Sequence, residues 1–102
     1  MMGYDVSHTP RTGDGGVDLL ARKNGRLTVV QCKAHNKRIP IGVARELAAS
    51  MSDFKASDAI IACYEGVTKP VEEYIKGKRI SVLALPQIVE LQRLHGNYRP
   101  EK

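Results

Sequence analysis

Aromatic residues, cysteines and long hydrophobic runs are all scarce in this chain of 102 residues. It has no tryptophan and one phenylalanine, so its core has to be built from aliphatic side chains. Its two cysteines, Cys32 and Cys63, are too few for a disulfide framework, and no CxxC or Cys/His cluster predicts structural zinc. We expect both to be buried, reduced thiols. No hydrophobic run approaches the roughly 20 residues that span a bilayer and no secretory leader is recognisable, so we expect a cytoplasmic protein without a membrane segment.

Runs of like charge are also missing, although the chain as a whole is basic. Its 16 Lys and Arg residues outnumber 11 Asp and Glu residues, which gives a net charge of +5. A basic domain attracts polyanions, and nucleic acid is the commonest polyanion inside a cell. Because the charge is spread along the chain, it does not by itself separate a nucleic-acid-binding domain from an ordinary basic domain.

Hydrophobic periodicity predicts one α/β domain over residues 1–96 and a polar tail over 97–102. Strands at 17–22 and 26–33 flank Asn24-Gly25, two residues that tolerate the positive φ of a tight hairpin turn. The other predicted elements are a strand at 4–9, a helix at 42–54, a strand at 58–64, a helix from Pro70 to about Gly77, a strand at 80–85 and a closing helix from Pro86 to Gly96. The order β-β-β-α-β-α-β-α predicts a mixed sheet flanked by helices that cover its faces.

Three polar residues stand near this hairpin at positions where the fold alone does not need them. Gln31 and Lys33 are two apart in one strand and therefore share a face, whereas Cys32 points to the opposite face. Asp18 and Gln31 are equally far from the turn. A regular hairpin therefore makes them cross-strand neighbours, with Cβ atoms about 5 Å apart.

This set of residues has the chemistry of a phosphodiester hydrolase. Mg²⁺ prefers one or two carboxylates with carbonyl oxygens and waters, and Asp18, the Gln31 side-chain oxygen and the Cys32 backbone carbonyl can supply them. Mn²⁺ is the expected substitute. The cation would polarise the scissile phosphate and acidify a bound water, while Lys33 would orient that water and offset the charge on the phosphate. The alternative for each residue is an ordinary polar position in a strand or at a hairpin edge.

The same residues carry a resemblance to a known family. The segment Gly13-Asp14-Gly15-Gly16-Val17-Asp18-Leu19, followed by Val29-Val30-Gln31-Cys32-Lys33, resembles the catalytic core of Mrr-like restriction endonucleases. In this branch of the PD-(D/E)XK superfamily, Gln replaces the second acid. The strand at 59–62, the segment at 66–70 and the strand at 80–83 extend the likeness over roughly residues 3–94. The resemblance implies a restriction-endonuclease-like fold, Mg²⁺-dependent DNA cleavage by Asp18, Gln31 and Lys33, and a homodimer.

One element of the family pattern is missing from the sequence. Members usually begin with a helix that carries a glutamate near the metal, whereas this chain starts almost at the first strand. Three explanations stay open: the metal site is incomplete, a partner subunit completes it, or the chain is part of a longer protein. Asp14 is a candidate substitute carboxylate, with a turn-forming Asp between glycines as an equal alternative.

Several residues close to the proposed site in the sequence are candidates for DNA contacts. They are Gly15 and Gly16, which permit close approach of the DNA backbone, and Arg11, His35, Lys37 and Arg38. A solvent-exposed residue without such a role is the alternative for the last four. No nucleotide cofactor is predicted, because neither a Lys-Ser pair nor a helix follows the glycines. The leading function is a DNA endonuclease, and the alternatives are a non-catalytic nucleic-acid-binding or assembly module on the same fold and a Holliday-junction-resolvase-like nuclease.

Overall fold

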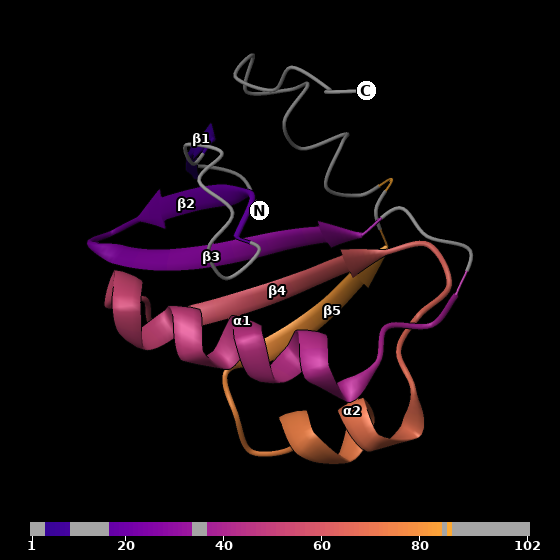
Figure 1. Cartoon of the computed structure of the whole chain (residues 1–102). Coiled ribbons are helices and arrows are strands. Elements are labelled where there is room, and N and C mark those ends of the chain that lie inside the picture. Colours follow the sequence, from indigo (N-terminus) through magenta and orange to yellow (C-terminus); the bar gives the residue numbers. More distant parts are fainter. Residues whose placement is uncertain (1–3, 9–16, 34–36, 85, 87–102) are drawn as a thin grey trace.

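The computed structural model describes residues 4–8, 17–33, 37–84 and 86. In this part of the chain one sheet has the strand order β1-β2-β3-β4-β5 (Figure 1). Its strands are β1 (Asp5–His8), β2 (Leu19–Lys23), β3 (Arg26–Lys33), β4 (Asp58–Cys63) and β5 (Ile80–Ala84). Helices α1 (Ile41–Phe54) and α2 (Lys69–Ile75) connect β3 to β4 and β4 to β5. Strands β1 to β3 are antiparallel, whereas β3, β4 and β5 run parallel.

This architecture confirms the predicted α/β class and mixed sheet. Every described element begins and ends within two residues of its predicted bounds. The predicted closing helix, apart from Pro86, lies outside the described residues, as do the domain boundary at 96 and the polar tail. Among the described residues, no helix has the length and hydrophobicity that a membrane crossing requires.

The β2–β3 hairpin fixes the relation between the two strands that carry the predicted site. Its turn residues Asn24 and Gly25 have φ angles of 54° and 79°, the left-handed values that a two-residue turn of this kind requires. The strand register runs from Lys23 opposite Arg26 to Leu19 opposite Val30. The paired register ends there, so Asp18 lies one residue beyond the paired part of β2.

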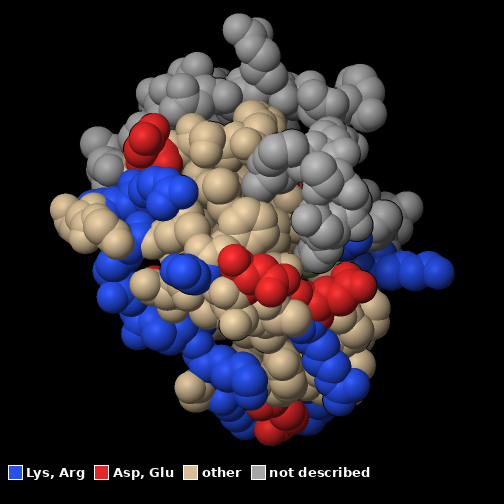
Figure 2. Space-filling model, turned by 60° about the vertical axis from the view of Figure 1, so that its left-hand side comes forward, with Lys and Arg blue, Asp and Glu red and all other residues tan. Residues whose placement is uncertain are grey.

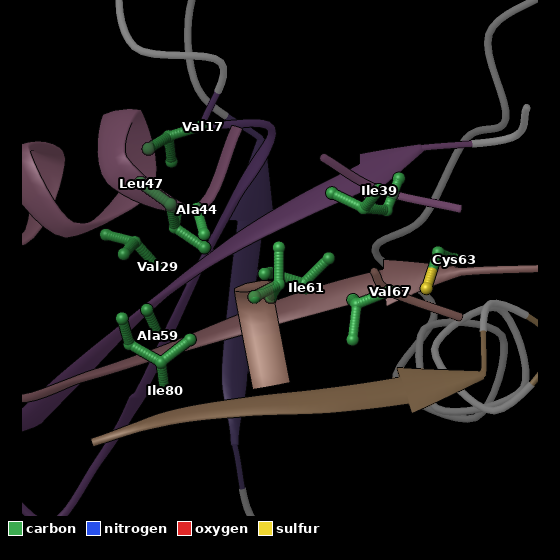
Figure 3. Packing of buried hydrophobic residues seen from close by; sticks show 11 residues of the cluster. Val17, Val29, Ile39, Ala44, Leu47, Ala59, Ile61, Cys63, Val67 and Ile80 are labelled. Atoms are coloured by element: carbon green, nitrogen blue, oxygen red, sulfur yellow. The ribbon is translucent and has the colours of Figure 1, made fainter. Parts of the chain in front are cut away.

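Two hydrophobic clusters lie on opposite faces of the sheet. The larger one joins Val29 of β3 and Ile61 of β4 to Leu47 of α1 (Figure 3) and also includes Val71 of α2. The intervening strand residues, such as Val30 and Ile60, belong to the second cluster. Both described helices therefore cover the same face, as expected for two successive crossovers of one hand between parallel strands. The prediction that helices cover both faces depends on the closing helix, which lies outside the described residues.

The parallel strands give the sheet two distinct edges across the strand ends. We call the edge formed by the last residues of β3, β4 and β5 the carboxyl edge, and the edge formed by their first residues the amino edge. At the carboxyl edge the segments that leave β3 and β4 pair through an isolated bridge between Ile39 and Val67. The Ile39 amide donates to Gly66 at 2.9 Å, and the Thr68 amide donates to Ile39 at 3.1 Å. These bonds hold Ile39 to the segment that follows β4.

Candidate active site

Asp18 stands one residue before β2, and two hydrogen bonds fix it to β3. Its Oδ2 accepts a bond of 2.7 Å from the Cys32 amide, and its own amide donates to the Val30 carbonyl at 2.8 Å. Because Val30 is the register partner of Leu19, the ladder is offset by one residue at Asp18, as at a β-bulge. The side-chain carboxylate thus replaces a backbone carbonyl where the ladder ends. The residue is nevertheless exposed, so the carboxylate is both positioned and accessible.

Gln31 is one of three buried polar residues among those described, with an exposed fraction of 2%. It lies opposite Ile61 of β4 and two residues after Val29, so the alternation of a strand puts it on the helix-covered face. Its Oε1 is buried without a hydrogen-bond partner among the described residues. Such an oxygen costs about 1–3 kcal/mol of stability. A ligand that takes up this oxygen would remove the cost.

Lys33 ends β3 at the carboxyl edge and is half-buried. It shares a face with Gln31, because two residues separate them along the strand. Its register partner is Cys63, the last residue of β4. Asp18 before β2 and Gln31 and Lys33 near the end of β3 therefore lie at the same end of these two adjacent strands. We call this place the catalytic corner after the role that the sequence predicts for it.

Cys32 contributes its backbone to this corner and its thiol to the opposite face, where it packs against the second cluster. Its amide points toward Asp18, and in an extended strand the carbonyl of the same residue points the same way. Burial raises the pKa of the Cys32 thiol from 9.0 to about 12, and the negative charge of Asp18 adds to the effect. The thiol is therefore protonated at neutral pH and is a poor nucleophile and metal ligand.

Both cysteines are free thiols, as predicted. Cys63 is buried, which confirms the expectation for that residue, whereas Cys32 is only half-buried. The difference follows from position, because Cys63 faces the helix-covered cluster and Cys32 faces the second cluster near the corner where the ladder ends.

The donors of the catalytic corner fit a hard divalent cation. The Asp18 carboxylate, the Gln31 Oε1 and the Cys32 carbonyl are all oxygens, which is the donor type that Mg²⁺ accepts while it keeps several waters. The unpartnered Gln31 oxygen is the observation that favours a cation here. The corner is poor in carboxylates, however, since no group of three or more His, Cys, Asp or Glu suited to a metal occurs within the described ranges.

Two of the predicted DNA-contacting residues follow the carboxyl edge. Lys37 and Arg38 are exposed, and Arg38 Nη1 donates to the Val67 carbonyl at 3.5 Å. This long bond ties the basic pair to the loop after β4. The remaining candidates, Arg11, Gly15, Gly16 and His35, and the alternative carboxylate Asp14 lie outside the described residues.

Sequence reasoning misses two features of the carboxyl edge. Tyr64, directly after β4, is 58% exposed and is the one exposed large hydrophobic side chain in the described part of the chain. Thr68 is the N-cap of α2, yet its side chain makes no capping bond, and its Oγ1 is buried without a partner among the described residues. The position of Tyr64 after an apolar run is visible in the sequence. The unpartnered Thr68 hydroxyl is not, because a capping Thr ordinarily bonds a backbone amide.

One comparison with known proteins shows the family, and another shows the fold. Residues 1–92 match the family model Mrr_cat, a restriction endonuclease family. The crystal structure of AF1548, a protein of unknown function, is similar with a TM-score of 0.68 at 16% sequence identity over 98% of this chain. The chain spans 65% of the length of that protein, and identity this low shows a shared fold alone. No curated protein matched the sequence.

Proposed function

The chain belongs to the Mrr_cat restriction endonuclease family, and from this membership we propose that it is a metal-dependent DNA endonuclease domain that hydrolyses phosphodiester bonds. The observation that carries the proposal is the catalytic corner. There a carboxylate bonded to the backbone, a buried amide oxygen without a partner, and a lysine come together at the end of one hairpin. Such a set suits the binding and activation of a phosphodiester better than it suits folding.

We assign the Asp18 carboxylate, the Gln31 Oε1 and the Cys32 carbonyl as the ligands of Mg²⁺, for which Mn²⁺ substitutes. When bound, such a cation polarises the scissile phosphate and lowers the pKa of a coordinated water. With one carboxylate among the ligands, we expect binding in the millimolar range, since the affinity of such sites follows the count of charged ligands.

The protein side chains perform the remaining work. The bond from the Cys32 amide holds the Asp18 carboxylate in place before substrate arrives, which lowers the entropic cost of assembling the site. Lys33, which shares a strand face with Gln31, would orient the attacking water and offset the negative charge that grows on the phosphate. Lys37 and Arg38, both exposed beyond β3, position the DNA through its phosphates.

The test is nicking of supercoiled plasmid by the purified chain with Mg²⁺ or Mn²⁺. Asp18→Asn keeps an oxygen that accepts the Cys32 amide but removes the charge, and Lys33→Met keeps the length of the side chain but removes the amine. We expect each to lower the nicking rate by about 10²-fold or more. Lys69→Met is the matched control, because Lys69 is an exposed lysine at the same edge and has no assigned role. Equal nicking by all four proteins would overturn the proposal.

Asp18 is the one carboxylate that we assign as a ligand among the described residues, and this favours one other function, a non-catalytic nucleic-acid-binding module on the same fold. Titration calorimetry separates the two functions. Absence of Mg²⁺ and Mn²⁺ binding at millimolar concentration, together with intact DNA binding, would support the non-catalytic module. The nicking assay can also compare four-way junctions with linear duplex. Preferred cleavage of the junctions would indicate a Holliday-junction-resolvase-like nuclease.

We also propose a homodimer. A duplex has two strands to cut, and a chain of 102 residues with a net charge of +5 covers few phosphates alone. Sedimentation of the purified chain with and without duplex DNA measures the stoichiometry. A monomer under both conditions would exclude the dimer while leaving the single-strand nicking activity open to test.

A further inference from the structure

The amino edge of the sheet, opposite the catalytic corner, gathers basic side chains from four separate segments. Figure 2 shows Lys and Arg in a band along the left-hand side and the bottom of this face. The basic residues of this edge stand at the β2–β3 turn, directly after both helices and just before β5. Six exposed residues define what we call the amino-edge basic surface, namely Lys23, Arg26, Lys55, Lys76, Lys78 and Arg79. Three acidic residues lie at the same edge, namely Asp53, Asp58 and Glu73.

Two arginines of this surface are fixed by one carboxylate. Asp58 Oδ2 accepts a bond of 3.2 Å from Arg26 Nη2, and Asp58 Oδ1 accepts one of 2.8 Å from Arg79 Nε. The side chain of Asp58 is 27% exposed, whereas those of Arg26 and Arg79 are 52% and 65% exposed. The carboxylate is therefore the inner anchor and the guanidinium groups face outward. A guanidinium has five N–H donors, so each arginine keeps donors for a further acceptor, and the three groups carry one net positive charge.

Two of the neighbouring lysines also have partners on α2. Lys78 Nζ donates to the Tyr74 carbonyl at 2.9 Å and lies 4.2 Å from the centroid of the Tyr74 ring. Lys76 forms an ion pair of 3.3 Å with Glu73. Lysines after a helix also complement the negative end of its dipole, which accounts for Lys55 and Lys76 without a ligand. That reason does not apply to Arg26, which begins β3, or to Arg79, which directly precedes β5.

We propose that the amino-edge basic surface binds the phosphate backbone of a DNA duplex segment separate from the one at the catalytic corner. The inference rests on the proposed function only for the identity of the polyanion. Along β3, Arg26 and Lys33 are seven residues apart, and at about 3.3 Å per residue this is about 23 Å. From β2 to β5 the surface crosses three interstrand spacings. At about 4.8 Å per spacing its width is about 14 Å. This width matches roughly four phosphates of one DNA strand, which follow one another every 3.4 Å or so along the helix axis.

The direction of the surface decides that two segments are involved. The surface runs across the strand ends at the β2–β3 turn and at the starts of β4 and β5, and the carboxyl edge runs across the other ends of these strands. A duplex that lies along one edge therefore does not pass over the other. A domain with both surfaces can hold the cleaved segment and a second segment of the same or another DNA at once.

The test is the salt dependence of duplex binding in EDTA, measured by fluorescence anisotropy. Arg26→Gln/Arg79→Gln removes two phosphate contacts, so the slope of log K against log salt should fall in magnitude by about 1.8, at about 0.9 per contact. Arg45→Gln/Lys69→Gln is the matched control, because it removes the same charge from exposed residues away from the amino edge. The control should change the slope by less than half as much. Equal changes in both pairs would reduce the effect to overall charge and overturn the proposal.

The double arginine variant leaves Asp58 without its two hydrogen-bond donors, and this could impair folding. A second variant pair therefore tests the surface without this change. Lys55→Gln/Lys78→Gln leaves the Asp58 group intact and should lower the slope in the same way. An unchanged slope with this pair and with a well-folded arginine pair would refute the surface. Vesicles with anionic phospholipid, bound more tightly than duplex and released by the same substitutions, would assign the surface to a membrane instead.

The nicking assay separates this proposal from the proposed catalytic function. At saturating plasmid the arginine pair should keep the nicking rate of the wild type, because the catalytic corner is intact, while the half-saturating plasmid concentration rises. A lower nicking rate at saturating plasmid would show that the two arginines belong to the cleavage site. That result would overturn the proposal of a separate surface. Asp18→Asn should show the opposite pattern, with a nicking rate lowered by about 10²-fold or more and an unchanged salt slope in EDTA.

Discussion

Replacing Gln31 by Met should stabilise the protein in metal-free buffer and abolish its response to divalent cations. Gln31 is 2% exposed, and its Oε1 has no partner among the described residues. A buried acceptor in this condition lowers stability by about 1–3 kcal/mol. Met has a similar volume and no group that needs a hydrogen bond, and volume-conserving changes in a core are well tolerated. We therefore expect the free energy of unfolding in EDTA to rise by about 1–2 kcal/mol, the lower part of that range.

Thermal denaturation measures this change directly. For a domain of about 100 residues, each kcal/mol shifts Tm by about 4–8 °C, so the expected rise is well resolved. Added Mg²⁺ stabilises the wild type by RT ln(1 + [Mg²⁺]/Kd), which is about 1.4 kcal/mol at ten times Kd. The Met variant should gain nothing, so the difference between the two proteins shrinks as Mg²⁺ is added.

Ser50→Ala is the matched control for removal of a buried polar group. Ser50 is 3% exposed, but its Oγ donates to the Glu46 carbonyl at 3.1 Å. Its removal should leave stability unchanged or lower it by up to about 1 kcal/mol, because a satisfied bond is lost. The sign of the effect thus separates Gln31 from a satisfied polar residue in the same core.

Two results would contradict the reasoning in different ways. A Met variant less stable than the wild type in EDTA would mean that the Gln31 amide is well satisfied in the folded protein. A Met variant that is more stable but still gains stability from Mg²⁺ would agree with an unsatisfied Gln31 oxygen in the wild type. It would also show that Gln31 is not a ligand of the cation. Only a gain in EDTA combined with a lost Mg²⁺ response supports the assignment.

Three further outcomes follow from the structure. Iodoacetamide at pH 8 should label Cys32 far more slowly in the native than in the unfolded protein, as measured by peptide mass, because burial raises the pKa of its thiol from 9.0 to about 12. Since the unfolded chain loses this proton first, the contribution of Cys32 to stability is complete below pH 9 and is lost as pH rises to about 12. Gly25→Ala should lower the free energy of unfolding by about 1–2 kcal/mol in urea denaturation, because φ is 79° at this turn position. Thr68→Val should leave stability unchanged or raise it, by thermal melting with and without Mg²⁺, because the Thr68 hydroxyl makes no capping bond.

The hairpin could be predicted from the sequence because the information that fixes it is local. Asn24-Gly25 selects a two-residue turn, and the alternation of side chains fixes which residues of the following strand share a face. The observed register, with Lys23 opposite Arg26, follows from these two facts. It brings Asp18 next to the Gln31–Lys33 segment without any knowledge of the rest of the fold.

The finer features of the catalytic corner could not be predicted, because they depend on contacts outside the hairpin. The offset that lets the Asp18 carboxylate take the Cys32 amide appears where the ladder ends. The near-complete burial of Gln31 depends on the packing of helices over β3, and periodicity does not position a helix over a particular strand residue. A pattern of residue types predicts faces but not which polar atoms are satisfied.

The amino-edge basic surface shows the same limit for electrostatics. In the sequence the charge is spread along the chain, and Arg26 and Arg79 lie 32 and 21 residues from Asp58. Only the parallel arrangement of β3, β4 and β5 sets their first residues side by side. Net charge predicts attraction to a polyanion, whereas the location of that attraction is a property of the topology.

The two edges of the sheet differ in how their polar groups are satisfied. At the amino edge the partly buried carboxylate of Asp58 is matched by two arginines. The two buried side-chain oxygens without partners among the described residues, those of Gln31 and Thr68, both lie toward the carboxyl edge. Selection for stability alone would replace such groups with apolar ones. Their presence on one edge is expected where a protein binds a ligand that supplies the missing partners, and it supports the proposed active site at the end of β3 that Lys33 occupies.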